Sequence, residues 1–459
     1  MKILFIAPLP PPVHGSAMVS QYIKESRVVN EAFDCDFVNL STSRSMDEIG
    51  KGGIKKLFRF VAAYFEVLWK LITHRYSLCY LAITCHGMGF LKDAPFVLLC
   101  KLFGRKVVLH QHNKGMSRDV NRWPYRWLMP LVYRNTTVML LSWHLYEDIS
   151  AVVKREQVVV CANGVPPLDN GQNNENVNVN DDEFTIHNSQ FTIGRPDGTL
   201  NSNPLTLNED EKTAALYDDD NQNENLSQSD VHRSEASLTA ATQLSPLQSN
   251  FNRTECFHRS EAQFSSSLSS SLEPSVPRLL FLSNLIESKG IYVLLEACRM
   301  LKEEGVAFQC DYVGGESKLI SGEAFRSAIA ERGLTDCVTY HGPQYGAAKD
   351  RFFREADIFV QPTFDDCFPL TLVEAMQYRL PIVSTDVGAI PDIVTDGVNG
   401  FVCPQRDVQA LAEALRKLIA EPQMRVAMGQ RGYELYRERM TLEVFEMRFE
   451  TLLREVSQC

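Results

Sequence analysis

Two acidic side chains flank a short turn in the segment from Gln361 to Pro404. Asp366 and Glu374 stand eight residues apart, and Phe368–Leu370 between them open a predicted helix. The first amides of a helix lack partners within the helix and the helix dipole is positive there, so this end binds phosphate well. One carboxylate before the helix and one inside it can accept hydrogen bonds from hydroxyl groups of a ligand, on either side of its bound diphosphate. The pattern therefore favours a ligand with that chemistry, which is a sugar nucleotide.

A cation that can face such a diphosphate lies in the segment FLSNLIESKGIYVLLEA. The segment is typical of a strand, a loop and the start of a helix, with Asn284 in the loop and Lys289 at the helix start. Lys289 would supply a point charge to a phosphate, whereas Asn284 would donate a hydrogen bond. A solvated lysine at a helix start is the other interpretation of Lys289, and the sequence leaves both open.

Two histidines, His110 and His112, end the apolar run KVVLHQHNKG in the N-terminal half. A histidine within a strand is more often structural, but ligands of open α/β sheets bind at the carboxyl ends of the strands, which favours a functional role here. Nearer the N-terminus, PLPPPVHGSAM places Gly15 after the first apolar run. This loop lacks the GxGxxG pattern of dinucleotide-binding enzymes.

Short apolar runs alternate with helix-length segments on both sides of these residues, and 459 residues exceed what one hydrophobic core usually fills. In the N-terminal half we predict strands at Ile3–Ala7, Leu78–Ile83, Lys106–Leu109, Thr137–Ser142 and Gln157–Cys161. In the C-terminal half we predict strands at Arg278–Ser283, Phe308–Val313, Val338–Tyr340, Asp357–Gln361, Pro381–Ser384 and Phe401–Val402. Helices are predicted at Lys289–Glu304, Glu323–Glu331, Ala347–Glu355 and Pro369–Tyr378. This alternation predicts an α/β protein with two doubly wound parallel sheets.

The segment 168–277 differs in composition from both halves. It is rich in Asn, Ser and Gln and holds 18 acidic against 5 basic residues. Such a segment cannot bury enough apolar surface to fold, so we predict a disordered insertion between two domains, with an interaction tail as the alternative. The rest of the chain holds 39 acidic and 41 basic residues, so the net charge of −11 belongs to the insertion. No basic field points to nucleic acid as a partner.

The spacing of the cysteines and the length of the apolar runs indicate the cellular compartment of the protein. Twelve cysteines are scattered singly, without CxxC pairs or Cys/His clusters at metal spacing, which is typical of a reducing compartment. No signal-peptide core and no apolar run of the roughly 18 residues that span a bilayer is present. We therefore expect a cytoplasmic protein without a metal or other cofactor. No Asp-x-Asp pattern is found at the end of an apolar strand, and the run Asp218–Asp220 lies in the insertion.

Two N-terminal stretches combine basic and aromatic residues and are expected to be helical. They are KKLFRFVAAYFEVLWKLITHRY (Lys55–Tyr76) and RDVNRWPYRWLMPLVYR (Arg118–Arg134). As helices they could lie in the interface of an anionic membrane, and the second, with Trp123 and Trp127 beside its arginines, is the better candidate. The alternative is that their apolar faces pack on the sheet. A lipid-linked acceptor and peripheral contact with the cytoplasmic membrane face are expectations from this pattern.

The segment from Gln361 to Pro404 resembles glycosyltransferase family 4. In that family two Glu residues are separated by seven residues, and the segment around them contains Gly-Phe-Gly/Pro-Leu. The second Glu begins the sequence Glu-Ala-Met, and a strand with the sequence Pro-Ile/Val-Val follows. The residues that match are Phe368, Pro369, Leu370, Glu374, Ala375, Met376, Pro381, Ile382, Val383, Gly388, Pro391, Gly397, Asn399, Gly400 and Pro404. The resemblance implies the GT-B fold, in which two Rossmann-like domains face each other across a cleft, and retaining transfer from an NDP-α-sugar without a metal.

The resemblance also implies roles for individual residues. Glu374 would hold the donor ribose. The turn of Phe368, Pro369 and Leu370 would face the sugar and diphosphate, with N–H groups from Phe368 and Leu370. Lys289 would neutralise the leaving group, and Gly15 and Asn284 would also lie at the donor. Asp366 stands where the family has its first Glu, and Asn284 stands where it has Arg. Of the two histidines, the alignment of Asn113 favours His112 near the donor sugar. The catalytic residues implied are His112, Asp366 and Lys289.

The sequence thus predicts an N-terminal acceptor-side domain (1–167), the insertion (168–277), a C-terminal nucleotide-sugar domain (278–440) and a last helix (441–459) that packs back on the N-terminal domain. The expected function is sugar transfer from an NDP-sugar to a glycan or lipid-linked acceptor in polysaccharide or glycoconjugate synthesis. Two alternatives remain: a sugar-nucleotide epimerase of the same fold, and a catalytically silent sugar-nucleotide-binding scaffold.

Overall fold

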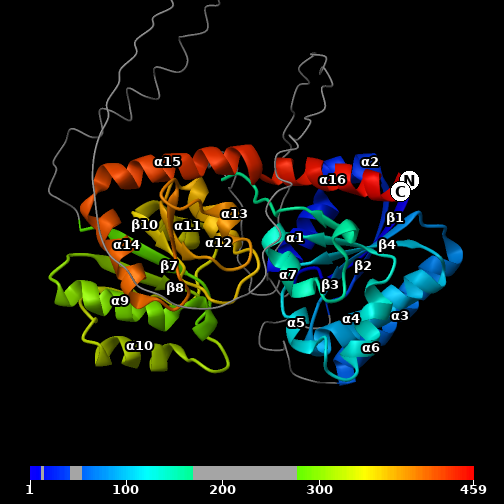
Figure 1. Cartoon of the computed structure of the whole chain (residues 1–459), viewed down its shortest axis with the longest axis horizontal. Coiled ribbons are helices and arrows are strands. Elements are labelled where there is room, and N and C mark those ends of the chain that lie inside the picture. Colours follow the sequence, from blue (N-terminus) through cyan, green and yellow to red (C-terminus); the bar gives the residue numbers. More distant parts are fainter. Residues whose placement is uncertain (12–14, 42–53, 169–275, 459) are drawn as a thin grey trace, which may run out of the picture. The chain divides into compact units, whose positions relative to one another are not determined.

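The N-terminal half forms one parallel sheet in the computed structural model, which describes residues 1–11, 15–41, 54–168 and 276–458 (Figure 1). The strand order is β2-β1-β3-β4-β5-β6. The strands are β1 (Lys2–Ala7), β2 (Asp34–Asn39), β3 (Leu78–Ile83), β4 (Lys106–Gln111), β5 (Thr137–Leu140) and β6 (Val158–Val160). The predicted insertion, including Asp218–Asp220, lies outside the described residues except at its two ends.

Both faces of this sheet are covered, because successive side chains of a strand point to opposite sides. Ile3 and Phe5 of β1 join a core with α1 (Gly15–Glu25), α2 (Arg27–Ala32) and α16 (Leu442–Gln458). Leu4 and Ile6 join a core with α3 (Ile54–Thr73), α4 (Gly87–Leu102) and α6 (Tyr125–Tyr133). Shorter helical elements complete this half: α5 (Met116–Asp119), η2 (Trp143–Leu145), α7 (Tyr146–Ile149) and η3 (Arg155–Gln157).

The last helix, α16, packs on strands of the N-terminal sheet although it follows the C-terminal domain in sequence. The Phe449 ring centroid lies 5.4 Å from that of Tyr80 and 6.5 Å from that of Phe5. Lys106 at the start of β4 donates a hydrogen bond of 2.8 Å from Nζ to the carbonyl of Ser457. Apolar and polar contacts therefore hold α16 on this sheet.

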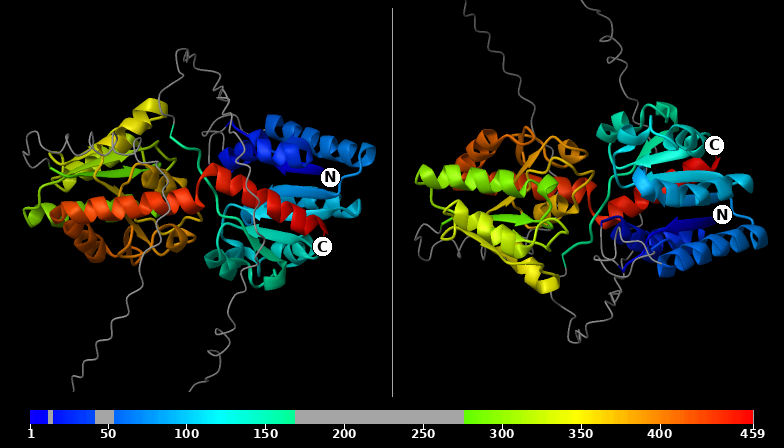
Figure 2. Two further views of the ribbon diagram at one scale, coloured as in Figure 1. Left: turned by 90° about the horizontal axis from the view of Figure 1, so that it is seen from above. Right: turned by 90° about the horizontal axis from the view of Figure 1, so that it is seen from below.

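The C-terminal half forms a second parallel sheet, in the order β12-β11-β10-β7-β8-β9. Its strands are β7 (Arg278–Leu282), β8 (Gln309–Val313), β9 (Val338–Tyr340), β10 (Ile358–Val360), β11 (Ile382–Thr385) and β12 (Gly400–Cys403). Its helical elements are η4 (Glu287–Lys289), α9 (Ile291–Glu303), α10 (Gly322–Glu331), α11 (Gly346–Glu355), α12 (Leu370–Gln377), α13 (Ile390–Ile393), α14 (Val408–Ala420) and α15 (Pro422–Arg439). Helices lie on both sides of the strands (Figure 2).

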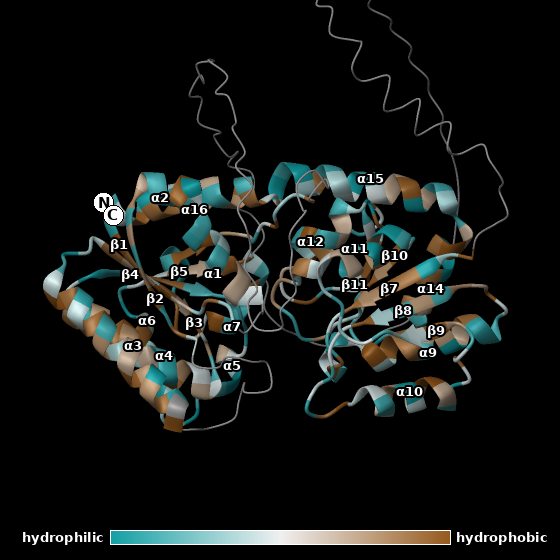
Figure 3. Cartoon of the chain, turned by 180° about the vertical axis from the view of Figure 1, so that it is seen from behind, coloured by the Kyte–Doolittle hydropathy of each residue, from teal (hydrophilic) through white to brown (hydrophobic). Residues whose placement is uncertain are grey.

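Two doubly wound α/β domains are therefore confirmed, and each predicted strand and helix of the C-terminal half lies within two residues of an observed one. The buried strands β1 and β7 are drawn largely in the hydrophobic colour in Figure 3, which is why their runs were easy to recognise. The prediction missed β2, because its sequence DCDFVN carries two acids. Lys2 pairs with both of them, with Nζ 3.4 Å from Asp34 and 3.2 Å from Asp36.

The prediction of one continuous helix over Arg118–Arg134 is wrong. The segment divides into α5, which ends at Asp119, and α6, which begins at Tyr125. Pro124 lies directly before α6, and its missing N–H is tolerated at the start of a helix and not inside one. The stretch Lys55–Tyr76 does form one long helix, α3.

Candidate active site

Two loops at the carboxyl ends of β7 and β10 are held together in the C-terminal domain. Gly290, which follows η4, has φ 81°, and a Cβ atom there would lie 2.0 Å from the carbonyl oxygen of Pro362. The carbonyl of Ser288 accepts a hydrogen bond of 2.8 Å from the backbone N–H of Phe364. Only glycine allows this approach, so Gly290 brings η4 against the loop that carries the first acidic residue.

Lys289 and Asp366, both predicted for the site, form an ion pair at this junction. Lys289 Nζ lies 2.6 Å from Asp366 Oδ2 and 3.2 Å from the carbonyl oxygen of Asp365. The two side chains are 21% and 15% exposed, so water screens the pair only partly. An ammonium has three N–H donors. These two contacts use two of them, and the third is left for an oxygen of a bound anion.

The turn before α12 is fixed from a neighbouring loop. The carbonyl of Cys367 accepts a hydrogen bond of 2.7 Å from the N–H of Ala389. Gly388, at φ 58°, lies so close that a Cβ atom would be 2.4 Å from the carbonyl oxygen of Asp366. The residue at the helix N-terminus is Pro369, whose side chain has no acceptor for the first amides of α12. Those amides can therefore bind an anion held next to Lys289.

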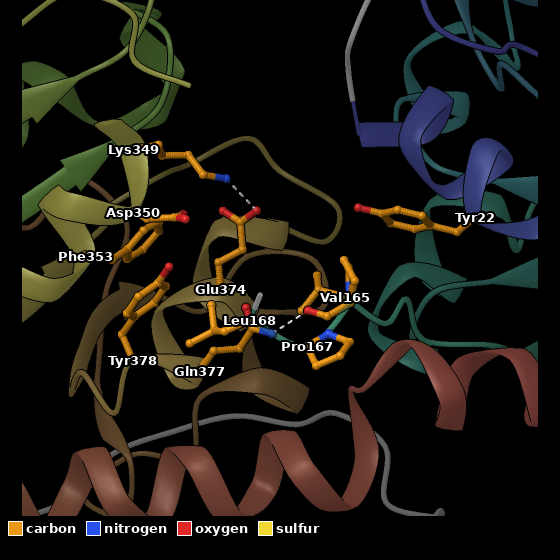
Figure 4. Close-up of a pocket in the computed structure, with 11 residues that line it drawn as sticks. Tyr22, Val165, Pro167, Leu168, Lys349, Asp350, Phe353, Glu374, Gln377 and Tyr378 are labelled. Carbon is orange, nitrogen blue, oxygen red and sulfur yellow. Dashed lines mark hydrogen bonds and ion pairs between the residues drawn. The ribbon is translucent and has the colours of Figure 1, made fainter. Parts of the chain in front are cut away.

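Glu374 lies one turn into α12 and has a partner that the sequence did not indicate. Lys349 of α11 places Nζ 2.9 Å from Glu374 Oε1, and the two side chains are 27% and 25% exposed. The dashed line in Figure 4 marks this contact. No helix spacing rule links residues on two different helices, so Lys349 could only be found from the folded chain.

A pocket of about 150 Å³ opens beside Glu374. Figure 4 shows the Tyr22 side chain extending toward the side of the pocket on which Glu374 lies. Burial, together with the negative charge of Glu374, raises the pKa of Tyr22 to about 12, so its phenol stays protonated and can donate a hydrogen bond. The lining residues are Tyr22, Val165, Pro166, Pro167, Leu168, Lys349, Asp350, Phe353, Glu374, Gln377 and Tyr378.

Asn284 has a structural contact in the loop after β7. Its Oδ1 accepts a hydrogen bond of 3.0 Å from the backbone N–H of Gly315, and the N–H of Leu285 donates to the carbonyl of Gly315 at 2.8 Å. Asn284 therefore ties the loops after β7 and β8 together. With Oδ1 used in this way, the amide NH₂ faces away from Gly315, and its predicted contact with a donor remains a prediction.

The two histidines of the N-terminal domain differ in burial. His110, inside β4, is fully buried, and its Nδ1 lies 2.7 Å from the Tyr80 hydroxyl. Burial, with a contribution from neighbouring His112, holds the pKa of His110 well below its usual value, so the ring stays neutral. His112 follows the end of β4, is only partly buried, and has its ring centroid 4.1 Å from that of His110. Of the two, only His112 is partly exposed, although its Nε2 is buried.

The remaining predicted residues are at loop and helix starts. Gly15 is the first residue of α1, and a Cβ atom there would lie 4.0 Å from Leu370 Cδ1. Phe368 is 6% exposed, so only its backbone can face a ligand. Among residues 1–11, 15–41, 54–168 and 276–458, no group of three or more His, Cys, Asp or Glu side chains is placed to hold a metal ion.

Replacing Lys289 with methionine should weaken binding of a nucleoside diphosphate about tenfold or more. The substitution removes a charge-assisted hydrogen bond worth about 1.5–3 kcal/mol and leaves the Asp366 carboxylate facing the phosphates. Isothermal titration calorimetry with UDP, GDP and ADP measures the effect.

Lys302→Met is the matched control, because Lys302 also pairs with an aspartate of this domain, Asp336. Equal affinities of Lys289→Met and the unchanged protein would place the diphosphate elsewhere.

The C-terminal domain is similar to a known family. Residues 268–435 match the family model described as "Glycosyl transferases group 1". An amylovoran biosynthesis glycosyltransferase of Erwinia amylovora is 36% identical over 148 residues, which are 31% of this chain and 35% of that protein. A D-inositol 3-phosphate glycosyltransferase of Streptomyces griseus is 30% identical over 156 residues, 33% of each chain. The chain thus matches about a third of the length of these relatives.

Solved structures extend the similarity in fold to both domains. Anabaena HepE in complex with UDP has a TM-score of 0.62 at 14% identity, over 99% of this chain and 100% of that chain. Sucrose-phosphate synthase from Thermosynechococcus elongatus has a TM-score of 0.60 at 14% identity, over 99% of both chains. At these identities the likeness concerns the fold alone.

Proposed function

We propose that this protein is a glycosyltransferase that moves a sugar from a nucleotide diphosphate donor to a glycan or lipid-linked acceptor. The observation that carries the proposal is the arrangement around α12. The Lys289–Asp366 pair lies at the uncapped start of this helix and Glu374 lies one turn inside it. All three residues fall within the segment that matches the glycosyl transferases group 1 model. The HepE structure that contains UDP-glucose shares the fold.

In this proposal the donor binds along the N-terminus of α12. The Glu374 carboxylate accepts hydrogen bonds from the hydroxyls of the ribose, and the first backbone N–H groups of the helix bind the diphosphate. When the bond between the sugar and the diphosphate breaks, negative charge develops on the leaving oxygen. The Lys289 ammonium lies where it can stabilise that charge, and such preorganised charge is usually a large contribution to catalysis.

The Lys289–Asp366 contact has a second consequence for the bound state. A diphosphate bound to the third donor would share the positive charge of the ammonium with Asp366. The Asp366 carboxylate has further lone pairs, which could accept a hydrogen bond from a hydroxyl of the donor sugar. His112 would act nearer the reacting carbon, and transfer would retain the configuration of an NDP-α-sugar.

We propose that the sugar transfer serves polysaccharide or glycoconjugate synthesis, because of what the relatives are described as doing. One is described as an amylovoran biosynthesis glycosyltransferase and another as a putative colanic acid biosynthesis glycosyltransferase. We further propose a cytoplasmic location. Ten cysteines of the described residues are free thiols, nine of them buried, which suits a reducing compartment.

Mass spectrometry of products formed from a panel of UDP-, GDP- and ADP-sugars with a membrane extract tests the proposal. Transfer of one sugar to an acceptor in the extract is the expected result. Turnover of a sugar nucleotide in the absence of the extract would favour an epimerase instead. Donor binding without turnover on any extract would identify a silent binding protein, and either outcome rejects the proposed function.

Activity should survive an excess of EDTA. The diphosphate is expected to be held by Lys289 and by the amides of α12, which supply positive charge where other enzymes use a divalent cation. The same product assay, run with and without EDTA, measures this. Complete loss with EDTA and recovery on adding Mg²⁺ or Mn²⁺ would show that a metal ion carries the diphosphate.

A further inference from the structure

Helix α3 has apolar side chains on two faces, of which only one packs on the described part of the protein. Ala63, Val67 and Leu71 are buried against the sheet, at 8%, 0% and 1% exposure. Phe60 and Tyr64 pack on Phe96 of α4, with ring centroids 5.4 Å and 5.8 Å away. These contacts account for the inward side of α3.

The outward face of α3 is a continuous apolar stripe. Its residues recur every three or four positions, so they lie on one side of the helix. They are Ile54 (75% exposed), Leu57 (62%), Phe58 (70%), Val61 (38%), Phe65 (60%), Trp69 (67%) and Ile72 (61%). Single exposed apolar residues are normal in soluble proteins, whereas a contiguous row of large ones marks an interaction surface. Brown and teal segments alternate along α3 in Figure 3.

The charge on α3 indicates what covers this stripe. The helix carries four basic residues, Lys55, Lys56, Arg59 and Lys70, and one acidic residue, Glu66. A helix with a long apolar face, aromatic residues and an excess of bases is typical of one that lies in the interface of an anionic bilayer. No helix of the described residues is long and apolar enough to cross a membrane. A helix of 20 residues extends about 30 Å, so α3 can lie along such a surface over its whole length.

The other candidate stretch is less suited to be the main contact. Trp123 and Trp127 are 81% and 67% exposed, which fits the headgroup region of a bilayer. Two of the arginines beside them have contacts within the protein, as Lys70 of α3 has with Asp36 at 3.7 Å. Arg122 lies 2.8 Å from Asp119, and the Arg126 guanidinium stacks over the Trp127 ring at 4.9 Å. The exposed apolar row is also shorter here than on α3.

We propose that α3 docks the N-terminal domain on an anionic lipid bilayer, with the stripe from Ile54 to Ile72 in the interface. This docking goes beyond the proposed sugar transfer. Its use, which rests on that proposed function, would be to bring the acceptor side of the enzyme to a lipid-borne acceptor. Binding itself depends only on the surface.

Co-sedimentation of the full chain with vesicles tests the docking. Vesicles of phosphatidylcholine with phosphatidylglycerol should bind the protein, and those of phosphatidylcholine alone should bind it less. Phe65→Ser with Trp69→Ser should lower binding to the anionic vesicles about tenfold or more, since two large apolar side chains no longer enter the interface. The matched control is Leu319→Ser with Val426→Ser, which removes residues that are 94% and 69% exposed in the C-terminal domain. The control should bind as the unchanged protein does.

Three outcomes would overturn the docking. The first is equal binding by the α3 variant and the control. The second is the absence of any binding to anionic vesicles. The third is a wild-type dimer that the α3 substitutions convert to a monomer without changing vesicle binding, because a second copy of the chain would then cover the stripe. Far-UV circular dichroism and thermal melting, measured in parallel, show whether each variant is folded. Since the readout is binding alone, vesicle binding without sugar transfer would reject the proposed function and leave the docking intact.

Discussion

Replacing Glu374 with alanine should lower the affinity for a nucleoside diphosphate about tenfold to a hundredfold, because each charge-assisted hydrogen bond to the ribose is worth about 1.5–3 kcal/mol. The loss should affect the free nucleoside diphosphate and the intact donor alike, since both carry the ribose. It should also leave the Lys349 ammonium, now 2.9 Å from the carboxylate, without its acceptor. Calorimetry with the nucleotides, followed by turnover at saturating donor, measures both effects.

Lys349 separates a direct role of Glu374 from a structural one. If the carboxylate serves only to pair with Lys349, the Lys349→Met variant should lose as much nucleotide affinity as Glu374→Ala, and the double variant should lose no more. If Glu374 binds the ribose, Lys349→Met should have the smaller effect. Glu413→Ala, at an exposed position on α14, is the control and should bind normally. Wild-type binding and turnover by Glu374→Ala would remove the main support for the sugar-nucleotide site.

The sequence predicted the parts of the fold that are written in local patterns. Buried parallel strands such as β1 and β7 are continuous apolar runs, and the helices between them follow the apolar period of 3.6. The edge strand β2 was missed because its acids are paired with Lys2, which is distant in sequence and adjacent only in the folded sheet. The break between α5 and α6 was missed although Pro124 marks it, because the aromatic and basic pattern around it continues on both sides.

The site residues also divide into those that a local sequence pattern predicts and those that only the folded chain reveals. Glu374, Asp366 and the turn before α12 lie in one segment, and their spacing sufficed to find them. The pairing of Lys289 with Asp366 required Gly290 to pack on Pro362, a contact between loops 72 residues apart that no local pattern reports. Lys349 was missed for the same reason. The outward stripe of α3 was visible as an amphipathic pattern, but only the fold shows which of its two apolar faces the sheet covers.

Replacing His112 with alanine should lower turnover about a hundredfold or more and leave the affinity for the nucleoside diphosphate within about threefold. This is the usual scale for a positioned polar group that acts in the transition state and not on the bound nucleotide. His112 follows the carboxyl end of β4, where ligands of parallel sheets bind, and belongs to the other domain from Glu374. The two substitutions should therefore fail differently, one in nucleotide binding and the other in turnover.

His110 provides the contrast for this test. It is fully buried and its Nδ1 lies 2.7 Å from the Tyr80 hydroxyl, so His110→Ala should leave a cavity and an unpaired hydroxyl in the core. Its main effect should be a lower Tm, with turnover reduced only in proportion to the folded fraction. Thermal melting and turnover, measured on both variants, distinguish the two histidines. A His112→Ala protein with normal turnover, or one that loses nucleotide affinity as Glu374→Ala does, would show that His112 has no separate role near the reacting carbon.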